Sequence, residues 1–143
     1  MVTIPIHIHY LPDSPHLEIT NYGGCVDLYN YNELCLKTGE KGFINFGVSM
    51  QLPKMYDALI FPRSSTFKRY GILLTNSVGY IDNSYNGTED YWMACVYATR
   101  DITIPKGTRC FQFRLIEKQP SIDFIQENNL NNINRGGFGS SGV

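Results

Sequence analysis

The chain has 143 residues, of which 43% are hydrophobic and 17% charged, and its formal net charge is −1 at neutral pH. This composition is typical of a single globular domain that buries about two-thirds of its unfolded surface, and it excludes a disordered chain. A nearly neutral chain without a run of Lys or Arg is not expected to bind nucleic acid or an anionic membrane.

Neither targeting segments nor zinc-ligand patterns are evident. No apolar run approaches the length of a membrane span, and the first residues do not form a basic-then-apolar signal segment. The four cysteines, Cys25, Cys35, Cys95 and Cys110, include no Cys-x-x-Cys pair, and we expect them to be reduced, small apolar residues. We therefore expect a cytoplasmic protein.

Short strands are predicted along the first part of the chain. Residues 3–10 alternate Ile with other side chains, which predicts a strand with one apolar face, and Pro5 places it at a sheet edge. Residues 21–29 indicate a turn running into a short strand that carries Asp27, and residues 42–50 predict a further strand.

A strand and a short helix are predicted next. Residues 56–61 form an apolar run, and residues 62–70 follow it directly. Pro62 favours a helix start, and Ser64 and Ser65 offer capping oxygens, so we expect a short helix within residues 62–70.

A β-hairpin is predicted around the dipeptide Asn86-Gly87, which lies between runs rich in β-branched and aromatic residues. Both positions tolerate positive φ, so the dipeptide is a strong signal for a tight turn between paired strands. The hairpin would carry the carboxylate of Asp82 on its first arm and the ring of Tyr85 at its tip. Its unpaired backbone groups could read the edge of a small planar ligand. The alternative is an ordinary surface hairpin with a solvated Asp.

The last part of the chain contains one alternating strand and a glycine-rich end. Residues 109–116 alternate polar side chains with Phe and Leu, and residues 121–134 are polar and rich in Asn. Residues 135–143 contain too many glycines for regular structure. Many short strands with Gly and Pro turns indicate an all-β sandwich or barrel, which we place at residues 1–128 with a flexible arm at 129–143.

Three segments carry groups that suit phosphate. Arg63-Ser64-Ser65 places a guanidinium beside two hydroxyls and backbone N–H groups, all of which can bind phosphate oxygens. Gln112 can donate its amide to a phosphate, and Asp27 can hold Mg²⁺ through its waters. The alternatives are a capped turn at Ser64 and Ser65 and an ordinary turn acceptor at Asp27.

The end of the chain suggests a lid. Phe138 is a single aromatic among glycines and serines, and its ring has no evident core to join. A mobile segment that stacks this ring on a base and binds phosphates through Ser140, Ser141 and backbone N–H groups would close over a ligand. The alternative is a disordered tail. Together these features suggest a nucleotide with several phosphates, although neither a Walker-type loop nor a Rossmann repeat occurs.

Five segments, taken in order, resemble the five motifs of trimeric dUTPases. They are Gly24-Cys25-Val26-Asp27-Leu28-Tyr29, Pro62-Arg63-Ser64-Ser65, Gly79-Tyr80-Ile81-Asp82-Asn83-Ser84-Tyr85-Asn86-Gly87, Gly107-Thr108-Arg109-Cys110-Phe111-Gln112 and Arg135-Gly136-Gly137-Phe138-Gly139-Ser140-Ser141-Gly142. The match covers nearly the whole chain, and its second, third and fifth motifs are the specific ones.

The resemblance implies a distorted β-barrel or jelly-roll-like subunit of the β-clip type. It also implies a homotrimer with active sites at the subunit interfaces. The implied reaction is hydrolysis of dUTP to dUMP and pyrophosphate, by in-line attack of water on the α-phosphorus with the help of Mg²⁺. Such an enzyme acts in the cytoplasm, or in a host cytoplasm if its source is a phage or virus.

The resemblance also implies roles for residues of this chain. Asp82 would orient the attacking water, Tyr85 would pack beneath the deoxyribose, and the backbone of Gly79 and Ile81 would read the uracil edge, where cytosine would leave buried groups unpaired. Asp27 would hold the hydrated Mg²⁺. The phosphates and the base would be held by the remaining motif residues: Arg63, Ser64, Ser65, Gln112, Arg135, Phe138, Gly139, Ser140 and Ser141.

Three motifs depart from the family pattern. The third motif has Ser84 and Asn86 where a second acid and an Arg are common. The first motif has Gly24-Cys25 where Ala-Gly is usual. Fewer residues than usual separate Arg135 from Phe138, so Arg135 is not assured of reaching the γ-phosphate. We expect these changes to affect affinity and lid closure more than the attacking water.

Two alternative functions share the same motifs. A dCTP deaminase of this fold also has Arg-Ser-Ser in its second motif, but it needs a Glu on the strand after the third motif, and residues 91–96 contain none. A non-catalytic, dUTP-sensing regulatory protein could use the fold without turnover. The presence of all five motifs, Asp82 included, argues against a dead enzyme.

Overall fold

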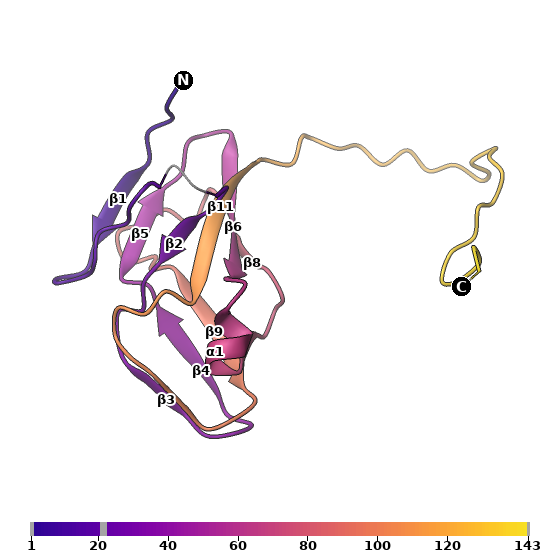
Figure 1. The fold of residues 1–143 in the computed structure, drawn as a ribbon. Coiled ribbons are helices and arrows are strands. Elements are labelled where there is room, and N and C mark those ends of the chain that lie inside the picture. Colours follow the sequence, from indigo (N-terminus) through magenta and orange to yellow (C-terminus); the bar gives the residue numbers. More distant parts are fainter. Residues whose placement is uncertain (1, 21–22, 143) are drawn as a thin grey trace.

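The computed structural model describes residues 2–20 and 23–142. Within these ranges the chain forms eleven strands and one five-residue helix, which confirms the expected all-β, jelly-roll-like fold (Figure 1). The turn expected at Asn21 and Tyr22 lies outside the described residues, and the strand that follows carries Asp27 as predicted.

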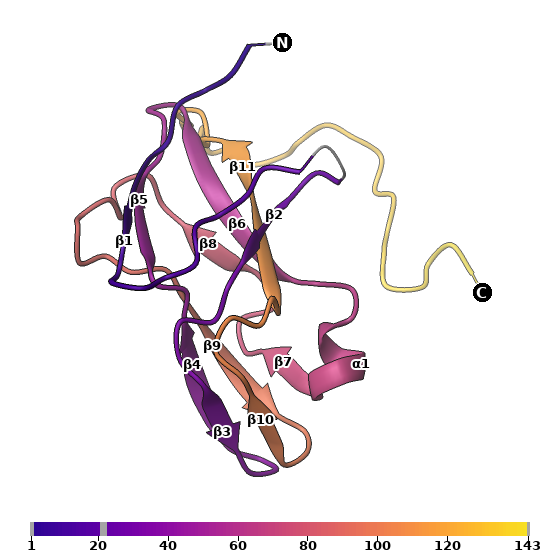
Figure 2. The same ribbon diagram turned by 60° about the vertical axis from the view of Figure 1, so that its left-hand side comes forward.

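The strands form four antiparallel sheets. In chain order the elements are β1 (His7–Tyr10), β2 (Val26–Leu28), β3 (Leu34–Leu36), β4 (Lys41–Asn45), β5 (Val48–Gln51), β6 (Tyr56–Pro62), α1 (Thr66–Tyr70), β7 (Ile72–Leu74), β8 (Gly79–Ile81), β9 (Met93–Ala98), β10 (Ile102–Ile104) and β11 (Phe111–Glu117). One sheet has the order β2-β11-β6-β8 and another β4-β9-β7, while β1 with β5 and β3 with β10 form two-stranded sheets. Figure 2 shows β3 and β10 as a ribbon at the opposite end of the body from the N-terminus.

The four-stranded sheet forms one wall of the core. Its β6 and β11 pair over seven residues, so they form the longest ladder of the fold. Trp92 is fully buried against this sheet, with its ring 5.1 Å from that of Phe113 in an edge-to-face contact. Phe111 lies two residues before Phe113 on β11, and its ring centroid is 5.8 Å from that of Phe46. Burying a side chain of this size stabilises a fold by about 1.5–3 kcal/mol, so these rings anchor the sheet to the elements behind it.

The hairpin predicted at Asn86-Gly87 is wrong. The flanking runs do pair, as β7 and β9, but the chain between them leaves to form β8, which pairs with β6 in the other sheet. Neither Asn86 nor Gly87 has the positive φ that a type I′ turn requires. The connection turns instead where the Asp82 carbonyl accepts the N–H of Tyr85, and again where the Gly87 carbonyl accepts the N–H of Asp90. The ladder to β6 and the burial of apolar side chains outweigh the local turn preference.

Two strand boundaries also differ from the prediction. Residues 42–50 form two strands, β4 and β5, because the chain turns between them at Gly47, where φ is +68°. The first strand is an edge strand as predicted, but its ladder begins at His7. The strands predicted at residues 56–61 and 109–116 correspond to β6 and β11.

The predicted helix is present, but its predicted capping is wrong. The helix begins at Thr66, and Ser65 at the N-cap makes no side-chain capping bond. The buried Thr66 hydroxyl instead donates to the carbonyl of Cys110, which attaches the helix to the start of β11. Gly71, with φ of 61°, ends the helix in the left-handed conformation that favours glycine.

Beyond β11 the chain leaves the body as an extended arm (Figure 1). Residues 121–142 are exposed throughout, and Figure 2 shows the arm away from the sheets in a second view. In the described ranges, no helix has the length and apolar character needed to cross a membrane.

We expect Gly47→Ala to destabilise the fold, because a Cβ at this position would lie 2.5 Å from Ser14 Oγ and 2.9 Å from Tyr31 Cδ2. The left-handed backbone alone costs about 1–2 kcal/mol for a residue with a Cβ. Gly137→Ala is the matched control, since a Cβ there meets nothing within 4 Å. Urea unfolding of both variants is the measurement. Equal midpoints for the two would contradict the proposed constraint at Gly47.

Candidate functional site

A cavity of about 470 Å³ opens beside β2, β11 and the end of β6. Its volume lies within the usual range for small-ligand sites. Four of the predicted ligand and metal residues line it, namely Asp27, Arg63, Ser64 and Gln112. Ser65, which was also predicted to bind phosphate, is not among the lining residues.

The sheet register brings these residues together. Gln112 on β11 lies opposite Asp27 on β2 and opposite Phe61 on β6. Directly opposed residues of antiparallel strands point to the same face, so the amide of Gln112 and the carboxylate of Asp27 share one side of the sheet. Arg63 follows β6, and its N–H donates to the Cys110 carbonyl at 3.0 Å, which extends the pairing past the strand end.

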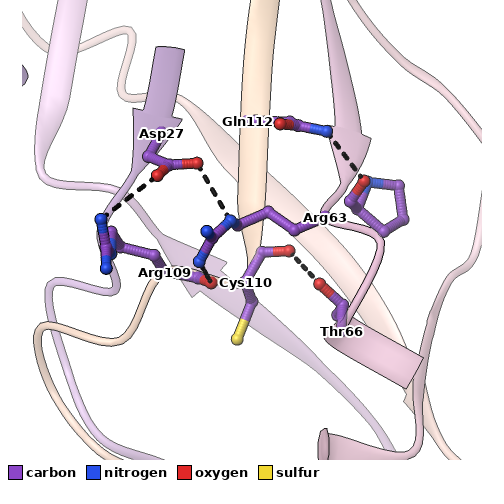
Figure 3. Close-up of polar contacts among 7 residues, drawn as sticks. Asp27, Arg63, Thr66, Arg109, Cys110 and Gln112 are labelled. Carbon is purple, nitrogen blue, oxygen red and sulfur yellow. Dashed lines mark hydrogen bonds and ion pairs between the residues drawn. The ribbon is translucent and has the colours of Figure 1, made fainter. Parts of the chain in front are cut away.

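The carboxylate of Asp27 lies between two guanidinium groups (Figure 3). Its Oδ1 is 3.1 Å from Nε of Arg63, and its Oδ2 is 3.4 Å from Nη1 of Arg109. Nη1 of Arg63 also donates to the Arg109 carbonyl at 3.1 Å, and Nε2 of Gln112 donates to the Pro62 carbonyl at 3.4 Å. These contacts hold the nitrogen donors in place before any ligand arrives.

The charges around the cavity balance. Its charged lining residues are two guanidiniums, Arg63 and Arg109, and two carboxylates, Asp27 and Glu18. The side chains of Asp27 and Arg63 are 26% and 31% exposed, and ion pairs at such exposure contribute about 1 kcal/mol or less. The guanidiniums can therefore exchange a carboxylate for a phosphate at low cost. A triphosphate would add several negative charges, so an accompanying cation would be needed for neutrality.

The oxygen donors at this cavity suit Mg²⁺. Asp27 and Glu18 supply carboxylates, and Mg²⁺ is commonly held by one or two carboxylates together with phosphate oxygens and water. Among residues 2–20 and 23–142 no group of three or more His, Cys, Asp or Glu could hold a metal. The donor set thus fits an ion that arrives with a phosphate ligand, and it does not form a closed protein cage.

A second group of predicted residues lies around Asp82. Its Oδ1 accepts hydrogen bonds from the Ser84 hydroxyl at 2.6 Å and from the Ser84 N–H at 2.8 Å. These two bonds, together with the nearby charge of Lys118, hold the pKa of Asp82 below its ordinary value. The carboxylate is therefore ionised at neutral pH. Tyr85 lies at the surface with its hydroxyl donating to the Tyr91 carbonyl at 2.8 Å.

Strand β8 offers one free edge. Gly79 pairs with Ile60 and Ile81 with Ala58, and β8 is the outer strand of its sheet. The outer edge of such a strand carries unpaired N–H and C=O groups at regular spacing. A Cβ on Gly79 would lie 3.0 Å from the Cβ of Ile60, which explains a glycine at this position.

Asp82 and the cavity lie at opposite ends of β6. Asp82 follows Ile81, which pairs with Ala58, whereas Arg63 lies five residues beyond Ala58. At about 3.3 Å per residue the separation is on the order of 16 Å, too far for both groups to contact one small ligand atom. The predicted tail residues lie outside the cavity, on the exposed arm beyond β11. They are Arg135, Phe138, Gly139, Ser140 and Ser141.

Sequence reasoning missed Arg109 and Glu18 as cavity residues. Arg109 was within reach, because it belongs to the same short motif as Gln112. Glu18 carried no signal, since only the folded chain brings it to the cavity that Asp27 also lines. Of the cysteines, all four are free, and burial raises the pKa of the Cys110 thiol to about 12, so this neighbour of the site stays protonated.

An all-β fold that gathers guanidinium, amide and carboxylate groups around one cavity has the chemistry that suits a phosphate-bearing ligand. The model of the dUTPase family matches residues 21–142. The chain belongs to the dUTPase family, which confirms the resemblance found in its motifs.

Individual relatives agree with this assignment. The chain is 41% identical to the SPbeta prophage-derived deoxyuridine 5'-triphosphate nucleotidohydrolase YosS of Bacillus subtilis, over 96% of this chain and 98% of that protein. It is 35% identical to the deoxyuridine 5'-triphosphate nucleotidohydrolase of Rickettsia canadensis, over 87% of this chain and 85% of that protein.

Solved structures share the fold. The Staphylococcus bacteriophage 80alpha dUTPase with dUPNHPP is similar with a TM-score of 0.83 at 19% identity, over 99% of this chain and all of that chain. A mutant dUTPase from phage phi11 of S. aureus, whose structure concerns a structural Mg(II) ion, is similar with a TM-score of 0.74 at 15% identity, over 87% and 99% of the two chains.

We expect Ser84→Ala to raise the pKa of Asp82 towards its ordinary value of about 3.9, because the hydroxyl donor to Oδ1 is lost. A carboxylate whose pKa is lowered by folding stabilises the fold above its unfolded pKa and loses this stabilisation as the pH falls through the folded pKa. The variant should therefore be less stable than the parent above pH ~4, and the difference should shrink below it.

A carbon-13 NMR titration of the Asp82 carboxyl group, with urea unfolding at two pH values, is the measurement. Ser77→Ala, in the turn before β8, is the control. An unchanged pKa in Ser84→Ala would show that Ser84 does not set the charge state of Asp82.

Proposed function

We propose that the chain carries out the reaction of its family, the hydrolysis of dUTP to dUMP and pyrophosphate, with the cavity at Asp27 as its phosphate site. The observation that carries this proposal is the cluster of Arg63, Arg109 and Gln112 around one carboxylate in a cavity of nucleotide size. Guanidinium groups bind phosphate oxygens through charge-assisted, often bidentate bonds. Such donors stabilise the charge that builds up on the phosphates during the reaction.

In this proposal Asp82 orients the attacking water. Both bonds from Ser84 go to Oδ1, which leaves Oδ2 to accept a hydrogen bond from water. Because its pKa is low, Asp82 is ionised and able to do so. The water is thereby held in line with the α-phosphorus, and the departing pyrophosphate stays on the guanidinium groups.

The outer edge of β8 would recognise the base. We assign the backbone of Gly79 and Ile81 to the uracil edge, and the exposed ring of Tyr85 to the face of the deoxyribose, where a 2′-hydroxyl would collide with it. A site that pairs with uracil rejects cytosine, because cytosine would leave buried donors or acceptors unpaired.

Mg²⁺ would be held by Asp27, through water, and by the phosphates. When bound, the ion neutralises phosphate charge and polarises the phosphoryl oxygens. Asp27 keeps Arg63 and Arg109 in place beforehand, and it would turn towards the hydrated ion when the guanidiniums take up phosphate. The zero net charge of the cavity supports this assignment, since the donors alone do not offset a triphosphate.

The active site would form between copies of the chain in a homotrimer. The separation of about 16 Å between Asp82 and Arg63 supports this arrangement, because a neighbour must supply the missing group. The arm at residues 129–143 would reach another subunit and act as a lid. Phe138 is fully exposed on it and would stack on the base, while Arg135, Gly139, Ser140 and Ser141 would bind phosphates.

We expect pyrophosphate release from dUTP with Mg²⁺, and little from dTTP, dCTP or UTP. Asp82→Asn should lower kcat by roughly 10²- to 10⁴-fold, because the neutral amide orients water poorly. Asp90→Asn is the matched control, since Asp90 lies in the same loop and its carboxylate accepts the Gly87 N–H.

Other outcomes of this assay would identify the alternatives. Ammonia release from dCTP would assign the chain to the deaminases of the same fold. Tight binding of dUTP without turnover would indicate a dUTP-sensing protein. Full activity of Asp82→Asn would refute the assignment of the water-orienting residue.

Mixing two inactive variants tests the shared site. Arg63→Ala and Asp82→Asn chains, unfolded together and refolded at equal amounts, should regain about a quarter of the parent activity, because random assembly gives that share of sites both native groups. A chain carrying both substitutions, mixed with itself, is the control. Activity that does not recover in the mixture would mean that one chain supplies both groups.

A further inference from the structure

A second carboxylate lies behind the loop that carries Asp82. Asp57, on β6, is only 2% exposed. Its Oδ2 accepts a hydrogen bond from the Tyr80 hydroxyl, and its Oδ1 accepts the N–H of Asn83 at 2.8 Å. In the described part of the chain no Lys, Arg or His forms an ion pair with Asp57.

The side chain of Asn83 strengthens the same attachment. Its Nδ2 donates towards three carbonyls of the segment that leads into β6: Leu52 at 3.2 Å, Pro53 at 2.8 Å and Tyr56 at 2.9 Å. The amide thus bonds the carbonyls of this segment to the turn at residues 82–85. Through these bonds Asp57 and Asn83 attach the turn to the start of β6.

The positions of these bonds matter more than their number. Tyr80 and Asn83 flank Ile81 and Asp82, so the backbone is held on both sides of the carboxylate that we assign to the attacking water. Ser84 then fixes the carboxylate itself through Oδ1. The direction of Oδ2 is therefore set by a chain of contacts that begins at Asp57.

A buried carboxylate without a cation is a costly way to hold a strand. Removing such a group from water is unfavourable unless hydrogen bonds replace its hydration. An apolar or amide side chain at this place on β6 would suit the ladder to β11 and β8 equally well, because the ladder uses backbone groups only. The tasks that require the acid are accepting the Tyr80 hydroxyl and the Asn83 N–H together.

We propose that Asp57 is a positioning residue for hydrolysis, which acts through Tyr80 and Asn83 to aim the carboxylate of Asp82 out of its own subunit towards the phosphates. This role rests on the proposed function, because it presumes that Asp82 orients the attacking water. Asp57 is buried, so it acts through its two hydrogen-bond partners and not on the substrate directly. It keeps the Asp82 turn in one orientation, while residues 84–89 of the loop that follows are exposed.

The expected signature is a loss of kcat with little change in KM for dUTP. The phosphate cavity lies at the other end of β6, and the ladder to β6 holds Gly79 and Ile81, so we expect substrate binding to change little. A displacement of a reacting group by about 1 Å can cost on the order of 10²-fold in rate. We expect Asp57→Ala to lower kcat by about that factor, and Tyr80→Phe, which removes one bond, by roughly 10-fold.

Rescue and control variants make the test specific. Asp57→Asn keeps an oxygen that can accept the Asn83 N–H, so it should recover part of the kcat lost in Asp57→Ala. Tyr97→Phe, on the exposed face of β9, is the control for the loss of a tyrosine hydroxyl and should match the parent. The Tyr80 side chain is 52% exposed, so Tyr80→Phe tests the proposal even if Asp57→Ala does not fold.

A readout without turnover completes the experiment. In the carbon-13 titration, Tyr80→Phe and Asp57→Asn should raise the pKa of Asp82 if the turn loosens and Ser84 moves away from Oδ1. Parent-like kcat and an unchanged Asp82 pKa in both variants would overturn the proposal. Asp82→Asn, measured in parallel, separates the two hypotheses: if it is active, the proposed function fails, and if it is inactive while Tyr80→Phe is normal, only the positioning role fails.

Discussion

The antiparallel ladder between β6 and β11 is the constraint on which the other parts of the site depend. It is seven residues long and lies in the middle of the four-stranded sheet. At one end its register sets Gln112 beside Asp27 and lets Arg63 follow the strand. At the other end β8 joins β6 and carries Asp82. Because strands hold a fixed rise per residue, the two sets of groups remain about 16 Å apart in any one chain. Under the proposed mechanism, a stiff sheet therefore makes activity depend on assembly.

Under the proposed function, weak interactions prepare the cavity at Asp27 for phosphate. Asp27 holds two guanidiniums near their working positions, but at this exposure each ion pair contributes little to stability. Donors that are already oriented need little reorganisation when charge develops on a substrate, which is the main source of electrostatic catalysis. Under the proposed function, a neutral cavity leaves part of the charge compensation to an ion that comes with the nucleotide.

Two carboxylates in different environments meet where the loop after β8 packs on β6. Asp82 is exposed, and the Ser84 donors keep its pKa low, so it is a stable anion facing solvent. Asp57 is buried, and its two carboxylate oxygens accept hydrogen bonds from the Tyr80 hydroxyl and the Asn83 N–H. The hydrogen bond to Asp57 in turn raises the pKa of Tyr80, which keeps that hydroxyl a donor. In the proposed mechanism, Asp82 is ready to orient water and Asp57 holds the backbone around it.

The sequence by itself determined the all-β class, the principal strands and four of the cavity residues, because alternation, apolar runs and short motifs are local properties. It also indicated Asp82, Tyr85 and the glycine-rich arm through the family motifs. Only the tertiary structure decided that Asn86-Gly87 does not close a hairpin, since pairing of β8 with β6 depends on residues far apart in the chain. For the same reason it alone placed Arg109 against Asp27, Glu18 in the same cavity, and Asp57 behind the turn that carries Asp82. Side chains that meet across strands leave no periodic signal, because their closeness is a property of the register and of what the core must bury.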